Sequence, residues 1–172
     1  MKKLTAIFSV TLLAGCASYD GRSLVVGVST TEEVTQVMGR PAMQWTEADG
    51  ARQFAYPRGP EGVRTYMVRI DANGKLRSIN NVMDLNSFAA VRGGMSVDEV
   101  IKILGPSRSD WTAYFERRDE LVLGWRYCDD WNKLARFFVL FDATRRTVRS
   151  TMSQQEALAP EVRGDGSLMC AK

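Results

Sequence analysis

The chain has 172 residues, of which 45% are apolar and 25% charged, and a formal net charge of only +3, so it has the composition of a globular protein with one or two small domains. So small a charge does not favour a nucleic-acid partner. Histidine is absent, which excludes Ser-His-Asp and Cys-His catalysis and every His-ligated metal site. We therefore expect a non-enzymatic protein without metal or cofactor, with carboxylate-based catalysis as the weaker alternative.

Residues 1–15 have the features of a bacterial export signal. Lys2 and Lys3 precede an apolar run of about eleven residues, which is too short to span a bilayer as a helix. The run ends in Leu13-Ala14-Gly15-Cys16, which resembles the lipobox of bacterial lipoproteins. The alternative is an ordinary signal peptide with an incidental cysteine. We expect acylation of Cys16, which would anchor the protein in membrane lipid; the alanine that follows favours the outer membrane, facing the periplasm.

After a short tether, a capped helix is predicted to start at Thr30. Glu33 stands three residues later and completes a capping box, and Gly39 is placed to end the helix. Two hairpins should follow. Residues 43–46 and 52–56 flank Asp49-Gly50, and residues 65–71 and 75–82 flank Asn73-Gly74, which are both strong turn dipeptides.

The same order of elements returns sixty-six residues later. Residues 87–91 form a short apolar turn or helix, and a second capped helix begins at Ser96, with Glu99 completing its capping box. Strands are predicted at 121–127 and 135–142. An internal duplication follows from this match. The predicted organisation is a signal peptide (1–15), a lipidated tether (16–23), a first unit (24–86), a second unit (87–153) and a C-terminal tail (154–172).

The second helix also carries a family resemblance. The sequence from Gly94 to Pro106, with Met95, Ser96, Glu99, Val100, Leu104 and Gly105, together with the lipobox, is similar to the SmpA/OmlA (BamE-like) outer-membrane lipoproteins. The ααβββ unit of that family also occurs in tandem in β-lactamase-inhibitor-like proteins. The resemblance implies an α+β fold of two ααβββ units, side by side, that form one antiparallel sheet backed by helices. It further implies a role in outer-membrane protein assembly or envelope integrity, with the β-barrel assembly machinery as a possible protein partner.

Alternation along the predicted strands separates two faces in the second unit. Phe137, Val139 and Phe141 should face the core, matching Tyr66, Val68 and Ile70 of the first unit. The opposite face would then hold an apolar patch edged by arginine: Val122, Phe138 and Leu140 with Arg126 and Arg136. We predict that this patch binds a protein partner, and the alternative is that the tail or a loop covers it. An inhibitor-like module that captures a periplasmic enzyme or peptide on a concave sheet is the second functional hypothesis.

Two cysteines remain beyond the lipobox, Cys128 and Cys170. In an oxidising periplasm such a pair favours a disulfide. A metal site at Cys128-Asp129-Asp130 is the weaker alternative, because the segment offers no further ligands.

Overall fold

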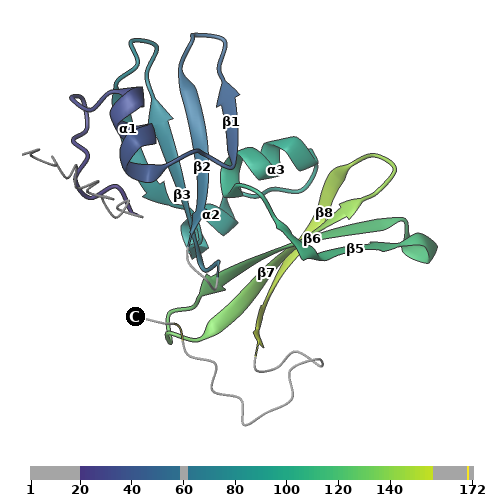
Figure 1. The fold of residues 1–172 in the computed structure, drawn as a ribbon. Helices are drawn as coiled ribbons and strands as arrows, with labels where there is room; N and C mark the ends of the chain where they lie inside the picture. Colours follow the sequence, from purple (N-terminus) through teal and green to yellow (C-terminus); the bar gives the residue numbers. More distant parts are fainter. Residues whose placement is uncertain (1–19, 59–61, 157–169, 171–172) are drawn as a thin grey trace, which may run out of the picture.

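The computed structural model describes residues 20–58, 62–156 and 170 (Figure 1). Cys16 and the expected signal peptide lie outside these residues, so acylation of Cys16 stays a prediction. Within the described ranges, none of the helices has the length and apolar character needed to cross a bilayer.

Three short α-helices, one 3-10 turn and eight strands make up the described chain. In order they are α1 (Thr31–Met38), β1 (Met43–Thr46), β2 (Arg52–Arg58), β3 (Arg64–Ile70), β4 (Leu76–Asn81), α2 (Leu85–Ala89), α3 (Val97–Leu104), β5 (Arg108–Phe115), the 3-10 turn Glu116–Arg118, β6 (Glu120–Cys128), β7 (Leu134–Asp142) and β8 (Thr147–Gln155).

Both predicted capping boxes are present. The Thr30 hydroxyl accepts a hydrogen bond from the backbone N–H of Glu33, whose carboxylate accepts from the backbone N–H of Thr30 at 2.8 Å. Ser96 and Glu99 make the same reciprocal pair at the start of α3. Gly39 ends α1 and Gly105 ends α3, both with positive φ. These contacts satisfy backbone N–H groups that a helix start otherwise leaves without partners.

The two hairpins of the first half are also confirmed. β1 pairs with β2 around Gly50, and β3 pairs with β4 around Gly74, both glycines having positive φ. β6 and β7 occupy the ranges predicted for the strands of the second half.

The predicted fold class is wrong. The chain does not form two ααβββ units with a single helix-backed antiparallel sheet. It is mostly β, with two separate four-stranded antiparallel sheets in the orders β1-β2-β3-β4 and β5-β6-β7-β8 (Figure 1). The edge strand β1 lies at the range predicted for the first hairpin, whereas β5 at Arg108–Phe115 is an edge strand that was not predicted from the sequence.

The sheets are separate because the first sheet is covered on both faces. On one face, Phe54 and Tyr56 of β2 pack with Val34 and Met38 of α1. On the other face, Ala55 and Met67 join the core that contains α2, α3 and the inner face of the second sheet. Figure 1 shows α3 between the two sheets. Apolar residues on both faces of β2 thus allow the second half to stack on the first sheet instead of extending it at an edge.

Candidate functional site

The outer face of the second sheet brings together all five residues predicted to bind a partner. In the register of β6 and β7, Val122 lies opposite Leu140, and Arg126 lies opposite Arg136. Phe138 lies opposite Gly124 between these two pairs. On the inner face, Phe137, Val139 and Phe141 are buried as predicted. The strand alternation therefore separates a core face from a second, partly exposed apolar face.

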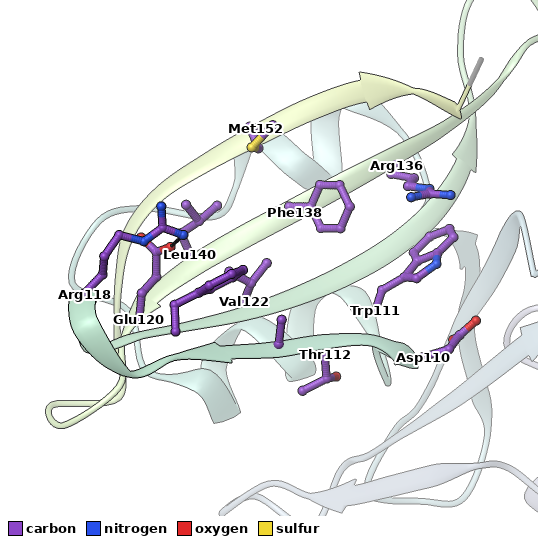
Figure 2. Close-up of a pocket in the computed structure, with 12 residues that line it drawn as sticks. Asp110, Trp111, Thr112, Arg118, Glu120, Val122, Arg136, Phe138, Leu140 and Met152 are labelled. Carbon is purple, nitrogen blue, oxygen red and sulfur yellow. Dashed lines mark ion pairs between the residues drawn. The ribbon is translucent and has the colours of Figure 1, made fainter. Parts of the chain in front are cut away.

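This outer face contains a cavity of about 410 Å³, here called the β5–β8 groove. Val122, Arg136, Phe138 and Leu140 line it, whereas Arg126 stands just outside the lining. The other residues that line the groove were not predicted; they include Trp111, Phe115, Arg118, Glu120 and Met152. Figure 2 shows Phe138 and Leu140 projecting from β7, with Arg118 and Glu120 at one end of the groove and Trp111 and Arg136 at the other.

Trp111 enters the groove because β5 is irregular. Arg108 pairs with Gly124 and Ala113 pairs with Val122, so an advance of five residues along β5 matches an advance of only two along β6. This bulge brings Trp111 over Gly124, where an added Cβ would stand 3.0 Å from Trp111 Cβ and 2.9 Å from Phe138 Cε1. Glycine is thus needed at position 124 for the two aromatic side chains to approach the sheet. Their ring centroids are 6.2 Å apart.

At the end of the groove near Trp111, two arginines pair with one buried carboxylate. Glu156, only 2% exposed, receives Arg126 in a bidentate contact, with distances of 2.6 and 2.7 Å to its two oxygens. The Nε atom of Arg136 lies 3.4 Å from the same carboxylate. Two arginines on adjacent strands of one face need such a counter-charge when they are buried. That requirement is the signal in the sequence that could have drawn attention to Glu156.

Three guanidinium groups surround the Trp111 ring. The Cζ atoms of Arg136, Arg108 and Arg126 lie 4.3, 4.8 and 5.3 Å from its centroid, which is cation–π range. Arg108 also forms a bidentate pair with Asp110, and this hydrogen bonding lowers the pKa of the Asp110 carboxyl. Arg108, Arg126 and Arg136 therefore gather around Trp111 at this end of the groove, and within the described ranges Asp110 and Glu156 are carboxylates that pair with them.

At the opposite end, Arg118 stacks on Phe115 at 4.5 Å and pairs with Glu120 at 2.8 Å. The floor between the two ends is apolar. The arrangement suits an elongated ligand with an apolar body.

The predicted disulfide between Cys128 and Cys170 is present, with the two Cα atoms 6.1 Å apart. The backbone N–H of Cys170 also donates to the carbonyl of Asn132 at 2.9 Å. The bridge thereby returns the chain to the β6–β7 hairpin and removes Cys128 as a metal ligand. Across the described ranges, no three Cys, Asp or Glu side chains converge in a way that could hold a metal ion.

Comparisons with known proteins do not support the SmpA/OmlA resemblance. No family model matches the chain, and no curated protein matches it. Because the two separate four-stranded sheets also differ from tandem ααβββ units, the assignment to that family is wrong. One solved structure is similar at a TM-score of 0.29 and 10% identity: an extracellular protein containing a SCP domain from Bacillus anthracis str. Ames. The match covers 91% of this chain and half of that one, and a TM-score this low carries no argument about fold or function.

Proposed function

We propose that the protein is a non-enzymatic lipoprotein, anchored through acylated Cys16 at the outer membrane, that binds a protein partner in the β5–β8 groove. The observation that supports this most directly is the groove itself, an apolar cavity lined by aromatic and arginine side chains on the outer face of the second sheet. Exposed apolar area beside arginine and aromatic side chains is typical of protein interfaces.

The charges around the groove favour binding over catalysis. Asp110, Glu120 and Glu156 each pair with an arginine at 2.6 to 2.8 Å. The hydrogen bonds from Arg108 lower the pKa of the Asp110 carboxyl, which makes that carboxylate a poor general base. The Trp111 ring and the apolar side chains of the groove suit a partner that inserts an apolar side chain between them.

A photo-crosslinking amino acid at Met152 tests the proposal in intact cells. Met152 lines the groove from β8 and is 46% exposed. The matched control is Tyr114, which is 60% exposed and lies opposite Leu121, a residue of the inner face. We expect a crosslinked partner at position 152 that is absent at position 114, and its loss when Phe138 is replaced by alanine.

Equal crosslinking at positions 152 and 114, or crosslinking at 152 that survives Phe138→Ala, would contradict a binding role for the groove.

The identity of the crosslinked partner separates the two functional hypotheses. A membrane-embedded or membrane-anchored partner supports a role in envelope assembly or integrity. A soluble periplasmic enzyme supports the inhibitor-like alternative.

A further inference from the structure

The turn that precedes α1 exposes three valines. Val25, Val26 and Val28 are 56%, 60% and 62% exposed, whereas Leu24 packs against the core of the first sheet. In Figure 1 this segment lies in the purple part of the ribbon before α1. Single exposed apolar residues are ordinary on protein surfaces, but three within four residues make this turn an unusually apolar tip.

The turn is held in a fixed shape. The Gly27 N–H donates to the Leu76 carbonyl at 2.8 Å, and the Ser29 N–H donates to the Val25 carbonyl at 2.9 Å. The Val25 N–H donates to the Ser29 hydroxyl at 3.0 Å. These backbone groups of Val25, Gly27 and Ser29 therefore bond within the protein, while the valine side chains are exposed. This combination suits contact with hydrocarbon, where a backbone group without a partner costs several kcal/mol.

Charge and chain length place the turn near a bilayer. Lys75 Nζ donates to the Val28 carbonyl at 2.9 Å, so an ammonium group lies at the base of the apolar tip, as in interfacial membrane anchors. Asp20 is four residues from Cys16 and can lie at most about 14 Å from it. The next residue, Gly21, packs against Met38 and Ile79, where an added Cβ would come within 3.1 and 2.8 Å of their side chains.

We propose that the Val25–Val28 turn is a second membrane contact, which inserts its valines among phospholipid chains. Together with the acylated cysteine it fixes which face of the protein lies on the membrane. The inference rests on the acylation of Cys16 proposed above. A covalent lipid alone would leave the body free to rotate, whereas an inserted turn that is packed against the first sheet defines one orientation.

Spin-label depth measurements test this contact. The acylated protein, carrying Val26→Cys or Val28→Cys and a nitroxide, is reconstituted in phosphatidylcholine vesicles. The matched control is Leu85→Cys on α2, which is 53% exposed and apolar. Cys128 and Cys170 are disulfide-bonded and do not take the label. We expect collisions with oxygen, relative to a water-soluble nickel complex, to be several-fold more frequent at positions 26 and 28 than at 85.

Equal accessibility at positions 26, 28 and 85 in vesicle-bound, acylated protein would overturn the inference and leave the lipid anchor standing. The mass of the Cys16 peptide tests the anchor separately. If that peptide is unmodified, the proposed anchor fails. Labels at 26 and 28 that still enter added vesicles would then support the turn as a membrane contact in its own right, and labels that stay in water would refute it.

Discussion

Replacement of Glu156 by glutamine is expected to destabilise the fold by about 3–5 kcal/mol, the range for breaking a buried ion pair from one side. Glu156 is 2% exposed, and the side chains of its partners Arg136 and Arg126 are 9% and 19% exposed. Glutamine fills almost the same volume and keeps one acceptor oxygen, so the change chiefly removes the charge.

The size of this loss in stability follows from the charges of Arg126 and Arg136, which glutamine at position 156 no longer offsets. Arg126 and Arg136 are directly opposite across β6 and β7, so their charges are neighbours on one face. At an effective dielectric constant of about 20, two unit charges about 5 Å apart repel by about 3 kcal/mol. The lost charge-assisted hydrogen bonds add to this figure, and the partial exposure of Arg126 reduces it.

Urea unfolding followed by circular dichroism measures the effect, with Glu116→Gln as the control because Glu116 is exposed. The control should change the free energy of unfolding by less than about 0.5 kcal/mol. Combining Glu156→Gln with Arg136→Met should recover part of the loss, since one buried guanidinium then disappears. A loss below about 1 kcal/mol for Glu156→Gln alone would refute the idea that this carboxylate offsets the buried charges of Arg126 and Arg136.

Three further outcomes are expected. Replacing both Cys128 and Cys170 with serine should cost about 4 kcal/mol, the chain-entropy value for their separation of 42 residues, as measured by urea unfolding under non-reducing conditions. Gly124→Ala should cost about 1–3 kcal/mol through overpacking and should change the tryptophan emission, and an unaltered spectrum with full stability would contradict the close approach described for Trp111. The pKa of Glu99 is lowered, chiefly by the backbone N–H of Ser96, so its contribution to stability is present above the ordinary value of 4.5 and is lost as the pH falls through the lowered pKa. Glu99→Gln should therefore flatten the acid limb of the stability profile, and an unchanged limb would count against the capping role.

Local features of this fold could be predicted from the sequence because neighbouring residues determine them. The capping boxes at Thr30 and Ser96 and the hairpin turn at Asn73-Gly74 each depend on a few adjacent side chains. The outward direction of Phe138 and Leu140 follows from strand alternation alone.

The arrangement of the sheets could not be predicted in the same way. Whether two sheets join at an edge or stack depends on which faces are covered, and Met67 is buried by residues of the other half of the chain. The bulge that brings Trp111 into the groove is set by the paired strand, and Glu156 reaches Arg126 across thirty residues of sequence. The family resemblance rested on the helix motif, which is a local pattern, and did not constrain the sheet topology.

The irregular register of β5 also affects the tendency of the protein to pair edge to edge with other chains. An edge strand with evenly spaced N–H and C=O groups is a template onto which another chain can add a strand. Between Arg108 and Ala113 that spacing is broken, and the strand bends over its own sheet. This edge therefore discourages neighbouring molecules from pairing into extended sheets, while it shapes one wall of the groove.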